Sequence, residues 1–202
     1  MRPIVVALMT LMLTLAGCAS SSPAKIATQT PNQATLESSV TPTQQAASSR
    51  SGSGSLFAID EVGVGPDGYV ALTNFTDQPA SLGGLFLCQG AKCFALPDVT
   101  VAPKATVRVA SGNGAGLDGV VATGATFGEL RPSDGEVALY ASQNVKDPKA
   151  MLVYLEWGST PHEGTQVAID AGLWIKGSYA PSVKNATRLF RQDTGLWLFD
   201  AK

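Results

Sequence analysis

Charge and histidine are both scarce in this sequence. Only 15% of the 202 residues are charged, the formal net charge is -2, and His162 is the single histidine. Because Lys and Arg supply most of the affinity for nucleic acid by neutralising phosphates, this balance argues against DNA or RNA as a partner. A Ser-His-Asp hydrolase would depend on that one histidine. We expect His162, between Pro161 and Glu163, to be a solvated loop residue.

Common catalytic motifs are also missing. The sequence has no G-x-S-x-G elbow, H-E-x-x-H helix or G-x-x-x-x-G-K-[ST] loop. The glycine-rich stretch 111–119 lacks a following lysine and contains an aspartate, so we interpret it as a loop between strands rather than a phosphate cradle. Carboxylate pairs are the remaining route to a hydrolase, and three stand out: Asp60 with Glu61, Asp134 with Glu136, and Glu156 with Glu163. We expect no catalytic residue, no metal and no cofactor.

Long apolar runs are limited to the N-terminus. The run from Ile4 to Leu15 is about a dozen residues, too short to cross a bilayer, and with Arg2 before it is typical of a secretory signal. The following residues, Leu-Ala-Gly-Cys at 15–18, resemble the lipobox of bacterial lipoproteins, whose cysteine becomes the acylated first residue. We predict a signal peptide over 1–17 and a lipid on Cys18. The alternative is an ordinary signal peptide with an incidental cysteine.

This anchor predicts a location in the bacterial cell envelope. Two or three acyl chains on one cysteine, at about 0.8 kcal/mol per buried methylene, hold a protein firmly to a membrane surface. Such a protein faces away from the cytoplasm. The residue after the cysteine is Ala19 and not an aspartate. In a Gram-negative cell this favours sorting to the outer membrane.

Residues 18–55 have few large apolar side chains. They consist mainly of Ser, Thr, Ala, Gln and Pro and end in a Gly-Ser repeat at 51–55. Such a segment cannot bury enough apolar surface to offset its chain entropy, so we predict a flexible tether. A proline-rich docking sequence is the alternative, but the prolines lack a PxxP pattern.

From Leu56 onward the sequence is typical of β-structure. Side chains alternate in "GYVALTNF" and "ATVRVA", and apolar residues recur at every second position in "GEVALYA" and "MLVYLEW". Turn sequences such as Gly65–Gly68 and Ser133–Gly135 separate the runs. We predict an all-β domain over 56–202, a sandwich or barrel of about 145 residues with one core. We expect a C-terminal extension of this domain, made of a short helix over 165–172, with Thr165 as its cap, and a final hairpin from "TRLFRQ" and "GLWLFD".

The domain has two cysteines, Cys88 and Cys93, in "LFLCQGAKCF". A hairpin with a four-residue loop would place them opposite one another, and outside the cytoplasm such a pair oxidises. A metal site needs further Cys or His partners, and a redox pair has the spacing C-x-x-C. We therefore predict a structural disulfide.

Several spaced motifs resemble the lamin-tail domain. "IDEVGVGPDGYVALTNFTDQPASLGGLFLC" contains an opening strand, the pattern YVxLxN at 69–74 and LxG at 82–84, and "FALPDVTVAPKATVRV" continues the match. "YLEWGS" and "AIDAGLW" are similar to the C-terminal part of bacterial members. The sequence departs from the family at Ala71, Phe86 and Lys104, where Glu, Trp and Gly are common. The resemblance covers most of 56–174 and implies an immunoglobulin-like β-sandwich that acts as a non-catalytic interaction module.

Aromatic residues are the candidate binding residues. Those in the last third of the chain are Tyr154, Trp157, Trp174, Tyr179 and Trp197. Aromatic faces stack on sugars or anchor protein partners, and packing in the core is the alternative. We expect a membrane-anchored, non-catalytic domain that binds a protein or a surface polysaccharide. The competing hypotheses are an extracytoplasmic hydrolase with a carboxylate pair and a purely structural envelope component.

Overall fold

The computed structural model describes residues 54–111, 120–122, 127–159, 161–181, 185–192 and 196–201. The expected signal peptide, Cys18, all but the end of the tether, most of the glycine-rich stretch and the turn at 193–195 lie outside these residues. Within the described ranges there is no helix with the length and apolar character that crossing a bilayer requires.

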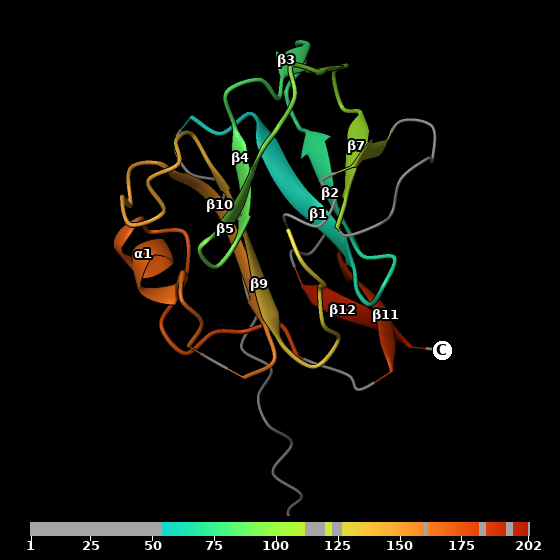
Figure 1. The fold of residues 1–202 in the computed structure, drawn as a ribbon, viewed down its shortest axis with the longest axis vertical. Coiled ribbons are helices and arrows are strands. Elements are labelled where there is room, and N and C mark those ends of the chain that lie inside the picture. Colours follow the sequence, from blue (N-terminus) through green and yellow to red (C-terminus); the bar gives the residue numbers. More distant parts are fainter. Residues whose placement is uncertain are drawn as a thin grey trace, which may run out of the picture. The chain divides into compact units, whose positions relative to one another are not determined.

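The largest sheet has six strands in the order β12-β11-β1-β2-β7-β8 (Figure 1). Its strands are β1 (Phe57–Gly63), β2 (Tyr69–Asn74), β7 (Thr106–Ala110), β8 (Val120–Ala122), β11 (Ala186–Arg191) and β12 (Trp197–Ala201). All neighbours are antiparallel except β7 and β8, which run parallel.

A second antiparallel sheet has four strands in the order β10-β9-β4-β5. They are β4 (Phe86–Gln89), β5 (Lys92–Ala95), β9 (Gly135–Tyr140) and β10 (Met151–Trp157). A two-stranded ribbon joins β3 (Ala80–Ser81) to β6 (Thr100–Val101). The one helix among the described residues, α1 (Thr165–Asp170), follows β10 and lies beside the second sheet (Figure 1).

Both large sheets contribute to one hydrophobic core. Phe57 and Ile59 enter it from β1, Leu87 from β4, and Leu155 and Trp157 from β10, and each side chain is at most 1% exposed. Burial on this scale is the dominant favourable contribution to folding. The second sheet is therefore held rigidly against the first, with the helix and its preceding loop at its side.

The expected β-structure is confirmed at each of the four quoted runs. In β7 the alternation is clean, since Val107 and Val109 are buried while Thr106 and Arg108 are exposed. The final hairpin is also confirmed as β11 and β12. Because β11 pairs with β1, this C-terminal segment belongs to the six-stranded sheet and is no separate extension.

The helix differs in detail from the prediction. It spans Thr165–Asp170, two residues shorter than expected, and its N-cap is Gly164 with no side-chain hydrogen bond at the cap. Thr165 is buried, and its hydroxyl bonds to Glu156 on β10 instead of capping the helix. The threonine therefore connects the helix to the second sheet.

Candidate functional site

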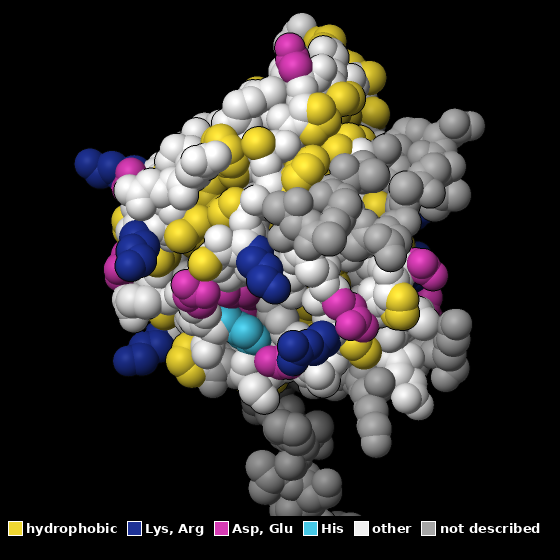
Figure 2. All heavy atoms as spheres, viewed as in Figure 1, with side chains coloured by type: hydrophobic (Ala, Val, Ile, Leu, Met, Phe, Trp, Pro, Cys, Tyr) yellow, Lys and Arg dark blue, Asp and Glu magenta, His cyan; other side chains and the backbone are white. Residues whose placement is uncertain are grey.

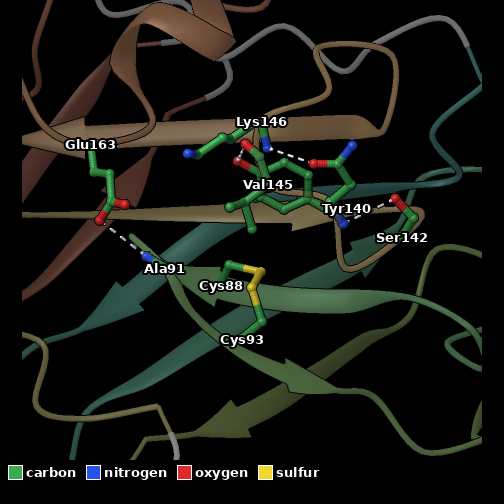
Figure 3. Close-up of a disulfide and its surroundings, with 9 residues drawn as sticks. Cys88, Ala91, Cys93, Tyr140, Ser142, Val145, Lys146 and Glu163 are labelled. Carbon is green, nitrogen blue, oxygen red and sulfur yellow. Dashed lines mark hydrogen bonds between the residues drawn. A yellow bond between two sulfur atoms is a disulfide. The ribbon is translucent and has the colours of Figure 1, made fainter.

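The predicted disulfide is confirmed. Cys88 on β4 and Cys93 on β5 are paired directly opposite each other and linked through their sulfurs (Figure 3). The hairpin is tighter than expected, because Gln89 and Lys92 also pair and leave a loop of Gly90 and Ala91 alone. Gly90 has φ +58°, a left-handed conformation that glycine adopts at no steric cost.

Four of the five candidate aromatics are buried in the core. Tyr154, Trp157, Trp174 and Trp197 are each at most 4% exposed, whereas Tyr179 is 46% exposed. Tyr154 and Trp174 meet edge to face, with ring centroids 5.3 Å apart. Trp157 donates its indole N–H to the carbonyl of Arg131 at 2.8 Å. Among these five, Tyr179 alone is exposed.

Two buried glutamates come together that were not expected as a pair from sequence. Glu136 on β9 and Glu156 on β10 are cross-strand partners, and both are buried. On the other sheet, Asp60 forms an ion pair with Arg191, and Glu61 pairs with two arginines. Glutamate within the apolar runs "GEVALY" and "YLEW" is the sequence signal that points to this pair, because a charged residue in a buried strand requires partners.

Glu156 is the centre of a buried polar cluster. Its side chain is fully buried. Oε2 accepts hydrogen bonds from Thr165 Oγ1 at 2.5 Å and from Tyr154 Oη at 2.9 Å, and Oε1 accepts one from Trp174 Nε1 at 2.8 Å. Burial raises the pKa of Glu156, but the hydrogen bonds, led by that from His162, outweigh it and leave the pKa lowered. Glu156 is thus a buried carboxylate whose charge the surrounding donors stabilise.

The second carboxylate, Glu136, shares the hydroxyl of Tyr154 with Glu156. Tyr154 Oη lies 2.7 Å from Glu136 Oε2 and 2.9 Å from Glu156 Oε2, yet it has one proton to donate. The one hydroxyl is therefore shared between the two carboxyl groups. Burial raises the pKa of Glu136, and this outweighs the lowering by the hydrogen bonds from Tyr154 and Gly164. The backbone N–H of Gly164 completes the contacts of Glu136.

The expectation of a solvated His162 is wrong. Its side chain is 14% exposed, with Nδ1 3.2 Å from Glu156 Oε2 and Nε2 3.5 Å from Asp134 Oδ2. The hydrogen bond with Glu156 raises the pKa of His162, and this outweighs the lowering by burial. Sequence gave no sign of this placement, because the loop folds back onto β10 only in three dimensions.

A pocket of about 390 Å³ opens beside this cluster. The hairpin closed by the disulfide contributes Gln89, Gly90 and Lys92 to its wall. The remaining lining residues come from 128–131, from the start of β9 and its preceding turn at 134–136, and from the loop at 162–163. Figure 2 shows the single histidine, in cyan, bordered by both acidic and basic side chains. The pocket is therefore polar, with walls from four separate segments.

We predict that Glu136→Gln makes the protein less sensitive to rising pH. Since the pKa of Glu136 is raised in the folded state, folding favours its protonated form, and that contribution is lost as the pH rises from about 4.5 through the folded pKa. Glutamine donates to Tyr154 at every pH. We take the difference in melting temperature, variant minus unaltered protein. This difference should be near its lowest value at pH 4 and should increase toward pH 7. Glu163→Gln, an exposed change in the same pocket, should show no such trend, and a parallel pair of curves for Glu136→Gln would contradict the prediction.

In the described part of the chain, no group of three or more His, Cys, Asp or Glu residues is placed so that it could bind a metal ion. No protein-family model matches the sequence, and no curated protein matches it.

Proposed function

We propose that the chain is a bacterial envelope lipoprotein that displays a non-catalytic binding domain. Cys18 carries the lipid, residues 18–55 form the tether, and residues 56–202 form an immunoglobulin-like sandwich of the lamin-tail type. The antiparallel sheets support this fold, since the quoted lamin-tail motifs fall on β1, β2, β4, β5 and β7. The disulfide between Cys88 and Cys93 supports an oxidising compartment. In a Gram-negative cell the anchor would lie in the outer membrane.

The pocket is the observation that carries a binding role. Its walls include a hairpin fixed by a disulfide and a loop fixed by the buried Glu156, so the backbone of two of its walls is held in place before a ligand arrives. Preorganisation of this kind reduces the entropy lost on binding. Loops and strand edges carried by a rigid β-scaffold are common binding surfaces. We propose that a protein or a surface polysaccharide binds at this pocket.

The contacts of His162 support a non-catalytic role. A nucleophilic hydrolase needs a base whose free nitrogen meets a serine, threonine or cysteine side chain. Here the two ring nitrogens of His162 face the carboxylates of Glu156 and Asp134. The histidine therefore serves to fix the loop at 161–165 onto β10.

A hydrolase with a carboxylate pair is the second candidate, favoured by one observation. Glu136, whose pKa burial raises, lines the same pocket as the exposed Glu163. Two carboxyl groups on one pocket wall are the components of general acid and base catalysis. Under this alternative, Glu136→Gln abolishes turnover of a glycoside or ester substrate. Under the binding proposal, no turnover exists to abolish.

Site-specific photocrosslinking in intact cells tests the binding proposal. A photoreactive residue replaces Gln89, which lines the pocket, or Lys149, which is exposed outside it and serves as the control. Each form is made with Cys18 and with Cys18→Ala. We expect capture of a protein or polysaccharide from position 89 and none from position 149, with capture at 89 retained after Cys18→Ala frees the exported chain from the membrane. Equal capture from both positions, or capture lost with the anchor, would overturn the proposal.

A further inference from the structure

Two glycines of the pocket each stand beside a charged side chain. At Gly90 a Cβ would stand 3.0 Å from Glu163 Oε2 and 3.5 Å from Glu136 Oε1. At Gly128 a Cβ would stand 3.6 Å from Lys92 Nζ and 3.4 Å from Gln89 Oε1. Both glycines have positive φ, at +58° and +81°. We call the wall beside Gly90 the Gly90 or acidic pole and the wall beside Gly128 the Gly128 or basic pole. Their exposed charged groups are Glu163 and Lys92, whereas Glu136 is 5% exposed. Glu129, Asp134 and His162 also line the pocket.

The basic groups are not used in holding the fold together. Within the described ranges, neither Lys92 nor Arg131 makes a side-chain hydrogen bond or an ion pair, although acidic residues line the same pocket. Arg131 lines the pocket from the segment 128–131, which also contributes Glu129. At the acidic pole, Glu163 accepts one hydrogen bond, from the backbone N–H of Ala91 (Figure 3). Charges of both signs are thus available to a ligand.

We propose that this pocket binds a zwitterionic group of the amino-acid or short-peptide class. The ligand's ammonium lies at the Gly90 pole against the carboxylate of Glu163, and its carboxylate lies at the Gly128 pole against Lys92. Complementary charge at both ends fixes the orientation of the ligand, because a reversed ligand would place like charges together. A ligand that carries only a positive or only a negative charge would meet a like charge at one of the two poles. A neutral sugar would leave the charges of both poles unpaired. This inference rests on the proposed binding function, since it names the group that the partner presents.

Four related dipeptides test the assignment. Alanyl-alanine has both charges, its N-acetyl form lacks the ammonium, its C-terminal amide lacks the carboxylate, and the doubly blocked form lacks both. Binding to the full chain in neutral detergent at pH 7 is measured by calorimetry. We expect the dissociation constant to increase about three- to fivefold on blocking either end, as for partly exposed ion pairs. Equal binding of all four forms, or no binding of alanyl-alanine, would overturn the inference.

Variants assign each end to its pole. Glu163→Gln should weaken alanyl-alanine and its amide about three- to fivefold but leave the N-acetyl form unchanged. Lys92→Gln should weaken alanyl-alanine and the N-acetyl form but leave the amide unchanged. Lys149→Gln, an exposed lysine outside the pocket, is the matched control and should change none of them. Glu163 and Lys92 are both exposed, so folding is preserved in the two pocket variants. If either variant weakened all forms of the dipeptide equally, the assignment of the two poles would be contradicted.

Competition in the crosslinking experiment separates this inference from the proposed function. If excess alanyl-alanine suppresses capture from position 89, the captured partner presents the zwitterionic group itself. If alanyl-alanine binds but capture never occurs, the ligand is a free solute and the proposed display function fails while the inference stands. If capture occurs and no dipeptide binds, the display function stands and the inference fails.

Discussion

Replacing Glu156 with alanine is expected to lower the free energy of unfolding by about 3 kcal/mol. The side chain is fully buried and accepts hydrogen bonds from four side chains: Tyr154, His162, Thr165 and Trp174. Removing it leaves donors in the core without an acceptor, and a buried group without its partner costs much more than the same loss at the surface. The protonated form of His162 also loses the carboxylate that stabilises it.

Urea denaturation at pH 7 measures this change, with Glu163→Ala as the matched control. Glu163 is exposed and belongs to the same pocket, so its removal should alter the free energy of unfolding by less than about 0.5 kcal/mol. The indole N–H resonance of Trp174 should shift in Glu156→Ala, because its contact with Oε1 is lost. A loss as small as that of the control would show that the buried cluster does not fix the loop.

Loss of the link between Cys88 and Cys93 is expected to cost about 2 kcal/mol. The bond joins residues five positions apart, so it closes a small loop, and the chain-entropy gain is at the low end for disulfides. The consequence is concentrated at the hairpin, because Gln89, Gly90 and Lys92 form one wall of the pocket. Freeing this wall should also weaken any ligand bound there.

Reduction isolates the effect of the bond from the effect of changing side chains. Urea denaturation of the unaltered protein with and without dithiothreitol gives the contribution of the bond, and the Cys88→Ala, Cys93→Ala double variant should not respond to dithiothreitol. Cys88 is 1% exposed, so the double variant loses further stability through packing. A reduced protein as stable as the oxidised one would refute the expectation.

The strands were predictable because their pattern is local. Val107 and Val109 point inward and Arg108 outward, and this alternation is written in consecutive residues. The pairing of β11 with β1 was not predictable. Val62 is the cross-strand partner of Leu189 although the two are far apart in the sequence, and no local pattern specifies that partner. The link between Cys88 and Cys93 was accessible because a hairpin is again a local structure.

The site was less predictable than the fold. Glu136 and Glu156 become neighbours through the register of β9 and β10, which a one-residue slip would change. Pairs chosen by closeness along the chain, such as Asp134 with Glu136, therefore missed them. The position of His162 depends on a loop that folds back onto β10. The residues on either side of His162 do not indicate its contact with Glu156. What sequence does offer is a glutamate within each of two apolar runs.

Mass spectrometry of the protein isolated from its own cells tests the central claim, a lipid-anchored domain outside the cytoplasm, most directly. We expect to recover from the membrane fraction a chain that begins at Cys18, with added diacylglycerol and acyl mass, and with Cys88 and Cys93 linked. A chain in the cytoplasmic fraction that begins at Met1, with an unmodified Cys18 and both later thiols free, would contradict it.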